Sequence, residues 1–161
     1  MRYTVRPMRP DEYPLLDEFL YQAIFLPEGT LPPPRDIVNR PELRVYVQNF
    51  GQYEHDRCLV ADVDAKPVGA VWVRMMNDYG HIDSETPSFA ISLLPQFRGQ
   101  GIGTALMRAM LQKLRDEGVK QASLAVQKQN YAVKMYRSCG FETVGENEQE
   151  YIMLCRLDDP D

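Results

Sequence analysis

LLPQFRGQGIGT, residues 93–104, is the stretch of sequence from which the fold can be inferred. A predicted strand ends at Leu94, three alternate glycines follow (Gly99, Gly101 and Gly103), and a long helix begins. Glycine lacks a Cβ atom, so the backbone can turn sharply there and approach a ligand closely. The free N–H groups of a helix's first turn point outward and carry partial positive charge. This order of elements therefore predicts a phosphate or diphosphate site.

Two side chains in this loop fit an anion site, and Arg98 also has a structural alternative. Thr104 can add a hydroxyl donor, while Arg98 either pairs with a phosphate or braces the loop. A Walker A loop fits less well, because Gly103 is followed by Thr-Ala rather than Lys-Ser/Thr. A Rossmann fingerprint fits less well too, because the glycines are spaced G-x-G-x-G and occur late in the chain. A glycine-rich turn without a ligand is the remaining alternative.

Around the loop, the chain alternates between apolar runs and turn signals. Strands are predicted where β-branched and apolar residues cluster or alternate. They cover Tyr3–Val5, Cys58–Val63, Val68–Met76, Phe89–Leu94, Gln121–Gln127, Phe141–Val144 and Glu150–Leu157. Helices are predicted after Arg9, over much of Pro41–Phe50, over Gly101–Glu117 and over Tyr131–Cys139. Three consecutive prolines make Pro27–Pro34 a loop.

Composition narrows the class of protein. The 161 residues are 44% hydrophobic and 25% charged, which is typical of one folded domain spanning residues 1–161. The net charge of −5 argues against a nucleic-acid partner held by phosphate contacts. No apolar run approaches membrane-spanning length, so no membrane partner is expected. The three scattered cysteines form no metal-ligand cluster, so we expect no metal and a reducing, cytoplasmic compartment.

Two motifs, in order, resemble the GNAT superfamily of N-acetyltransferases. The family signature Gln/Arg-x-x-Gly-x-Gly/Ala is matched by Arg98–Gly103. A second family segment, Asn-x-x-Ala-x-x-x-Tyr-x-x-x-Gly-Phe, is similar to the stretch that starts at Asn130-Tyr131-Ala132 and continues through Tyr136 to Gly140-Phe141. One predicted helix and one predicted strand separate the motifs, as in the family. The strand order also matches over nearly the whole chain.

The resemblance implies a mixed α/β fold with a bent sheet of about seven strands and about four helices. The fourth and fifth strands would splay apart in a V that receives the pantetheine arm of acetyl-CoA. The implied cofactor-binding residues run from the end of the fourth strand to the second motif. They are Leu93, Leu94, Arg98, Gly99, Gln100, Gly101, Ile102, Gly103, Thr104 and Asn130.

The implied reaction is direct attack of an amine on the acetyl thioester within a ternary complex. Tyr136 matches the family's general acid, which protonates the coenzyme A thiolate, although packing is its ordinary role. Many relatives carry a glutamate base where this chain has Ser88. The nearby candidates are His81, Asp83 and Glu85, and we choose Glu85. Burial as a small apolar residue is expected for Cys139.

The predicted acceptor is a primary amine of a small molecule. The resemblance places the acceptor pocket between the first two helices, their connecting loop and the central strands, including Trp72 and Arg74. Trp72 either stacks on a substrate or packs, and Arg74 either binds a carboxylate or pairs with an acid. A protein or peptide amine and a non-catalytic acyl-CoA-binding protein are the alternatives. A homodimer is possible through the final strands, unless Tyr151–Leu157 completes the chain's own sheet.

Overall fold

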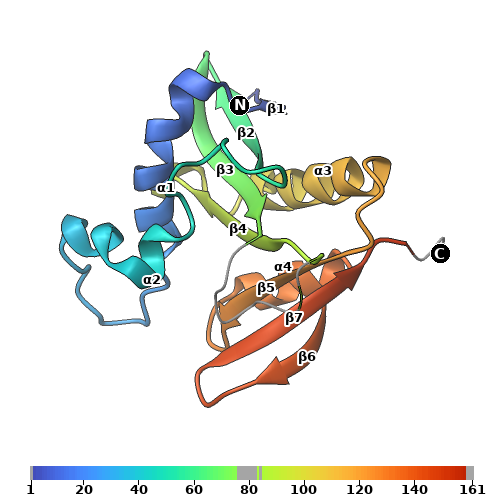
Figure 1. Ribbon diagram of the computed structural model, residues 1–161. Helices are drawn as coiled ribbons and strands as arrows, with labels where there is room; N and C mark the ends of the chain where they lie inside the picture. The colour runs from blue at the N-terminus through green and yellow to red at the C-terminus, as the bar shows by residue number, and fades with distance from the viewer. Residues whose placement is uncertain (1, 76–82, 84, 159–161) are drawn as a thin grey trace.

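The computed structural model describes residues 2–75, 83 and 85–158, which build one seven-stranded sheet with helices on its faces (Figure 1). The strands are β1 (Thr4–Pro7), β2 (Arg57–Val63), β3 (Lys66–Arg74), β4 (Ser88–Leu93), β5 (Gln121–Gln127), β6 (Glu142–Glu146) and β7 (Glu150–Arg156). The α-helices are α1 (Leu16–Ala23), α2 (Pro41–Arg44), α3 (Ile102–Asp116) and α4 (Ala132–Ser138). Short 3₁₀ helices are η1 (Pro10–Leu15), η2 (Arg35–Asn39) and η3 (Pro95–Phe97).

The sheet is continuous in its two halves and weakly joined between them. Its order is β1-β2-β3-β4-β5-β7-β6, and every neighbouring pair is antiparallel except β4 and β5. Strand β4 pairs with β3 along its whole length, from Ser88 to Leu93. It meets β5 in parallel at a single residue pair, Ser88 with Ser123. The two strands diverge beyond that pair, so the predicted splay between the fourth and fifth strands is confirmed.

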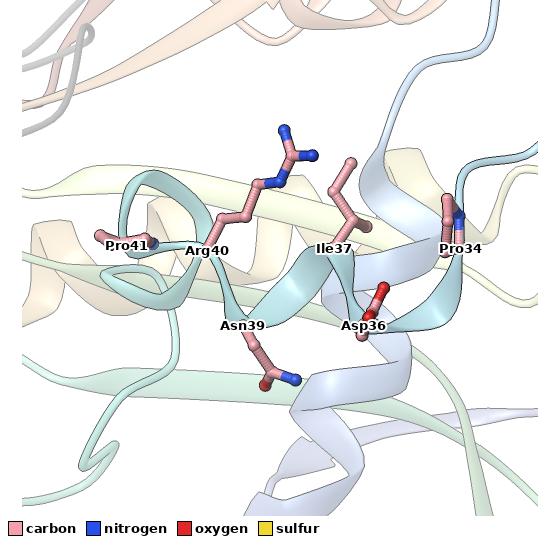
Figure 2. Close-up of a pocket in the computed structure, with 6 residues that line it drawn as sticks. All are labelled: Pro34, Asp36, Ile37, Asn39, Arg40 and Pro41. Carbon is pink, nitrogen blue, oxygen red and sulfur yellow. The ribbon is translucent and has the colours of Figure 1, made fainter.

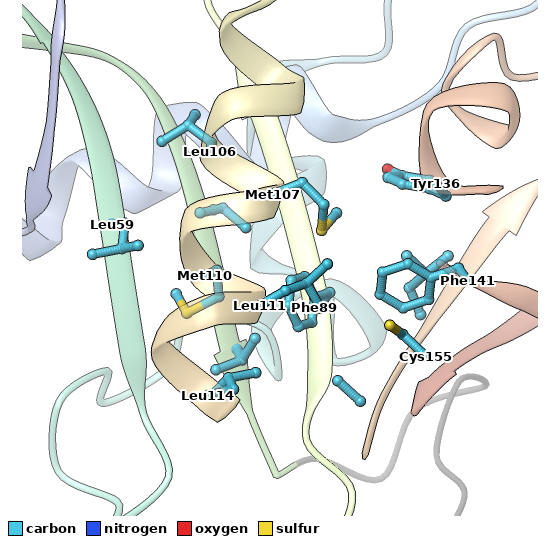
Figure 3. Close-up of a cluster of buried hydrophobic side chains, with 14 of the residues drawn as sticks. Leu59, Phe89, Leu106, Met107, Met110, Leu111, Leu114, Tyr136, Phe141 and Cys155 are labelled. Carbon is cyan, nitrogen blue, oxygen red and sulfur yellow. The ribbon is translucent and has the colours of Figure 1, made fainter. Parts of the chain in front are cut away.

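Each face of the sheet carries its own core, because side chains alternate along a strand. One core joins α3 and α4 to β2–β5 and β7, with Leu106, Met110 and Phe141 among its buried members (Figure 3). The other joins α1 and the segment after α2 to β2 and β3, with Phe19 and Trp72 at its centre. The apolar stripe predicted for the long helix is confirmed, since its buried residues recur at helical spacing.

The region after α2 differs from the prediction. A helix was expected over much of Pro41–Phe50, but α2 ends at Arg44 and turns follow to residue 55. Asn49 has a φ of 55° and Gly51 a φ of 95°, so the backbone turns left-handed where a helix would continue. The Arg74 side chain also donates to the carbonyls of Val45 and Gln48. Those carbonyls are therefore engaged by a distant residue rather than by a helix.

Strand β7 lies inside the sheet, between β5 and β6. Seven of its residues pair with β5, and its other edge pairs with β6. Of the two alternatives for Tyr151–Leu157, the structure therefore shows completion of the chain's own sheet, because both edges of β7 are occupied. Among the described residues, no helix is both long enough and apolar enough to cross a bilayer.

Candidate functional site

The loop between β4 and α3 needs glycine at two positions. Gly99 has a φ of 74° and Gly101 a φ of 86°, in the left-handed region that L residues avoid. A Cβ atom built on either would meet nothing within 4 Å, so open space lies beside the backbone there. Gly103 has an ordinary φ, and its Cβ would lie 3.8 Å from a Leu93 methyl. The backbone turn thus rests on the first two glycines.

The amides at the start of α3 have no protein partner among the described residues. Gly101 caps the helix without a side chain, and the first hydrogen bond to it comes from the Ala105 N–H at 3.1 Å. The N–H groups of Ile102, Gly103 and Thr104 precede that bond and are left for a ligand. Unpaired amides, a helix N-terminus and the space beside the glycines fit the diphosphate of coenzyme A.

Arg98 braces the loop, which was the second of its two predicted roles. Its Nε donates to the Leu93 carbonyl at 3.2 Å, and its Nη2 donates to the Gln22 carbonyl at 3.0 Å. The side chain is exposed, and its Nη1 has no partner among the described residues. Gln100 lies across the loop and donates to the Gln96 carbonyl at 3.2 Å.

The end of β4 presents backbone groups to the splay. The Leu94 N–H is used within the sheet, where it donates to the Val68 carbonyl at 2.9 Å. Strand β4 has no residue pair with β5 after Ser88, so its edge toward the splay lacks a neighbouring strand. Unpaired backbone groups on such an edge require a ligand or water. A pantetheine arm carries amides that fit this requirement.

Tyr136 is held by aromatic packing on α4 and is 8% exposed (Figure 3). Its ring lies 6.1 Å from that of Phe141, which in turn lies 5.6 Å from Phe89 of β4. Burial raises the pKa of Tyr136 above the ordinary tyrosine value, and nearby Cys139 acts in the same direction. The phenol therefore stays protonated at neutral pH. No hydrogen bond to its hydroxyl occurs among the described residues, where every fully buried side-chain oxygen has a partner, so the hydroxyl must be partly accessible.

The remaining residues predicted for the site do not lie together around Tyr136. Asn130 lies two residues before α4, and its side-chain oxygen accepts from the Ala132 N–H at 2.9 Å. Glu85 is exposed in the turn before β4, where its N–H donates to Asp83. Ser88 is buried, with its hydroxyl 3.5 Å from that of Ser123 where β4 and β5 meet. No described contact joins Glu85 to Tyr136, while His81 lies outside the described residues.

Trp72 and Arg74 have structural partners on the acceptor side. Trp72 is 0% exposed and donates to the Tyr46 carbonyl at 3.1 Å, so packing is its role. Arg74 forms a two-pronged pair with Asp56, at 3.0 Å for each bond. Asp56 also accepts from the Gly51 N–H at 2.9 Å. Sequence reasoning missed Asp56, although an arginine within an apolar strand indicates that a buried acid must lie nearby.

Two surface depressions lie away from the glycine loop. One, of about 420 Å³, is lined by Pro34, Asp36, Ile37, Asn39, Arg40 and Pro41. Figure 2 shows Arg40 and Ile37 extending to one side of this segment and Asn39 to the other. The second, of about 490 Å³, lies between β1, β2 and α3. No cluster of three or more metal-binding side chains occurs within the described ranges.

Comparison with known proteins places these features in one family. The model of the acetyltransferase (GNAT) family matches residues 21–141. Mouse N-acetyltransferase 8 is 37% identical over 55% of this chain, which corresponds to 39% of the mouse protein. The chain thus spans about two fifths of the length of the mammalian relatives that it matches. Acetyltransferase ECA0875 of Pectobacterium atrosepticum is 34% identical over 66% of this chain and 70% of its own length.

Solved structures share the fold at low sequence identity. The PaiA N-acetyltransferase of Thermoplasma acidophilum, in complex with coenzyme A, superposes with a TM-score of 0.70. The two are 17% identical, and the superposition covers 97% of this chain and 99% of that one. At this level of identity the likeness shows a shared fold.

Proposed function

Because the chain belongs to the GNAT acetyltransferase family, we propose that it transfers the acetyl group of acetyl-CoA to a primary amine of a small molecule. The observation that carries this proposal is the set of unpaired amides at Ile102, Gly103 and Thr104. They follow two left-handed glycines beside open space. A diphosphate bound there would direct the remainder of coenzyme A along the unpaired edge of β4, toward Tyr136.

Direct attack by the amine is the mechanism we propose. Tyr136 donates its proton to the departing coenzyme A thiolate, a role that needs a protonated phenol and a free hydroxyl. Its packing against Phe141 fixes the ring, so donation requires little reorganisation. The amine must be neutral when it attacks. We propose Glu85 as the group that accepts its proton, since it is exposed near the start of β4.

A small acceptor is favoured over a peptide by the burial of Trp72. An exposed tryptophan in the central strands would be suited to line an open groove, but this one packs beneath Tyr46. The charge of Arg74 is already neutralised by its ion pair with Asp56. Arg74 is therefore not expected to bind a carboxylate of the acceptor. We further propose a cytoplasmic location, which agrees with three free thiols at Cys58, Cys139 and Cys155.

A thermal-shift titration tests cofactor binding first. Acetyl-CoA and coenzyme A should raise the melting temperature with the logarithm of ligand excess, whereas ATP and NAD, which carry a diphosphate without a pantetheine arm, should do so only at higher concentration. A thiol-release assay with acetyl-CoA and a panel of small amines and peptides then tests transfer. Thiol release with small amines supports the proposal. Thiol release with peptides alone would show that the acceptor is a peptide amine rather than a small molecule. Binding without release across the panel would favour the non-catalytic alternative.

The role of Glu85 needs its own comparison. Glu85→Gln should lower kcat/KM for the best amine while leaving coenzyme A affinity unchanged. Asp83→Asn is the matched variant, because Asp83 lies in the same turn and its side chain bonds to Glu85 N–H and Thr86. An equal kcat/KM in wild type and Glu85→Gln would show that another group, or water, takes the proton.

A further inference from the structure

The narrow end of the splay is filled on both faces of the sheet. Strands β4 and β5 pair only at Ser88 and Ser123, which are both buried and whose hydroxyls lie 3.5 Å apart. Side chains alternate between the two faces along a strand, so the next residues, Phe89 and Leu124, point to the opposite face. There they are buried in the core that α3 and α4 cover. We call these four residues the apex of the splay.

A row of aromatic rings connects the apex to Tyr136. The Phe89 ring packs edge to face against Phe141, with 5.6 Å between centroids, and Phe141 packs in the same way against Tyr136, at 6.1 Å. All three are buried, and close-packed rings cannot withdraw without moving β4 or α4. In Figure 3 the Tyr136 hydroxyl points away from α4, toward the side on which α3 and β4 lie. A ligand group that bonds to this hydroxyl therefore lies beside packed rings.

Acyl-CoA in the proposed site has a fixed direction along β4. Its diphosphate would lie in the loop that follows Leu94, whereas the apex is at the other end of the strand, at Ser88. Six residue steps separate these ends, or about 20 Å at about 3.3 Å per residue. The pantetheine arm joins the diphosphate to the thioester, so the acyl group is the part of the molecule farthest from the loop. An arm that follows β4 toward Tyr136 thus points its acyl group toward the apex.

We propose that the apex restricts the transferred group to acetyl, with Phe89 as the specificity-determining residue. This inference rests on the proposed function and identifies what selects its acyl donor. The transfer step is the same for every acyl group: the amine nitrogen bonds to the acyl carbon, the carbon–sulfur bond breaks, and the amine loses a proton while the thiolate gains one. Each additional methylene of a longer acyl group would have to enter space that the Phe89 ring already fills.

The expected discrimination grows with the length of the acyl group. Extra methylenes in a close-packed region force side chains away from their preferred rotamers. One methylene changes the specificity of an apolar site by about tenfold or more. We therefore expect kcat/KM to fall about tenfold from acetyl-CoA to propionyl-CoA, and about a hundredfold from acetyl-CoA to butyryl-CoA. Affinity for free coenzyme A, which carries no acyl group, should not depend on the apex.

Thiol release by the full chain, measured with each of the three acyl-CoAs and the best amine, tests the proposal. Phe89→Leu keeps an apolar side chain but empties space at the apex, so it should raise the propionyl-to-acetyl ratio of kcat/KM about tenfold. Leu124→Ala opens the same apex from β5 and should change the ratio in the same direction. It also provides the test if Phe89→Leu does not fold. Both variants should bind coenzyme A as wild type does in calorimetric titration.

Leu59→Ala is the matched control for Leu124→Ala. Leu59 is buried in the same core, but β3 separates its strand from β4, so it lies about 10 Å from β4. This variant should lose stability and keep the wild-type acyl ratio. Equal use of propionyl-CoA and acetyl-CoA by wild type, a ratio unchanged in both apex variants, or a ratio raised equally by Leu59→Ala would overturn the proposal. Absence of thiol release by wild type with every acyl-CoA would instead count against the proposed function, so the two failures are distinguishable.

Discussion

The glycine loop and the segment from Val45 to Asp56 are both irregular, yet their polar groups are satisfied in opposite ways. In the segment, Arg74 donates to the carbonyls of Val45 and Gln48 at 3.2 and 2.8 Å, and Asp56 accepts from Gly51 N–H. In the glycine loop, the amides that begin α3 have no partner within the described residues. One region is closed by the protein's own side chains, and the other is left open, as the proposed diphosphate site requires.

The closed region should respond most strongly to loss of its carboxylate. Arg74 and Asp56 have side chains 3% and 0% exposed, so Asp56→Ala leaves a buried guanidinium without its counter-ion. The free energy of unfolding should fall by about 3–5 kcal/mol. Glu117→Ala removes an exposed partner of Arg57 and should cost about 1 kcal/mol or less. Equal losses in chemical denaturation would mean that burial does not distinguish the two pairs.

The open region should respond in catalysis rather than in stability. Tyr136→Phe removes the proton donor but keeps the ring against Phe141. We expect kcat to fall about 100-fold with coenzyme A affinity unchanged. Tyr131→Phe, at a side chain 90% exposed, is the control and should retain wild-type turnover. Turnover of Tyr136→Phe that matched wild type throughout a pH series would remove Tyr136 from the mechanism.

Acid should destabilise the contact between β1 and η1 through Glu12, near the start of η1. Hydrogen bonding to Arg6 lowers the pKa of Glu12 from 4.5 to about 2. A lowered folded-state pKa contributes stability above pH 4.5 that is lost as pH falls toward 2. Glu12→Gln should therefore cost about 2 kcal/mol at pH 7, and progressively less in acid. The check is denaturation of both proteins from pH 7 to pH 2. A cost independent of pH would show that Glu12 contributes by packing alone.

The smallest expected effect separates the glycines of the open region. Gly101→Ala places a Cβ on a residue with a φ of 86°, which costs about 1–2 kcal/mol and fills space beside the amides. Coenzyme A affinity should fall about tenfold by calorimetric titration, the equivalent of 1.4 kcal/mol. Gly103→Ala should have little effect, because its φ is ordinary and its Cβ would make only van der Waals contact. Matching affinities for the two variants would contradict the assignment of the turn.

Local patterns predicted the elements that bear on the cofactor. The strand at Gln121–Gln127 was predicted at its observed bounds, and α3 was predicted to within one residue at each end. The alternation of apolar residues in a strand and their helical spacing in a helix can both be seen within a short run of sequence. The glycines likewise indicate the left-handed turn. The resemblance to the GNAT family also implied the splay, which the single Ser88–Ser123 pair confirms.

Contacts between distant residues could not be predicted in the same way. The helix expected beyond Arg44 is replaced by turns whose carbonyls bind Arg74, a residue 26 positions from Gln48. Arg98 lies 76 positions from Gln22, so its bracing role has no local signal. The proposed acceptor side, with Trp72 bonded to Tyr46 and Arg74 bonded to Asp56, depends on such pairs. This explains why the motifs identify the family and a cofactor loop but not the acceptor.

Chemical-shift mapping of the backbone amides tests the central claim most directly. Coenzyme A titrated into ¹⁵N-labelled protein should move the N–H signals of Ile102, Gly103 and Thr104 more than those of any other segment. Inorganic diphosphate should move the same three signals at higher concentration. If coenzyme A fails to bind, or shifts residues elsewhere while these three amides stay unchanged, the loop after β4 is not the diphosphate site.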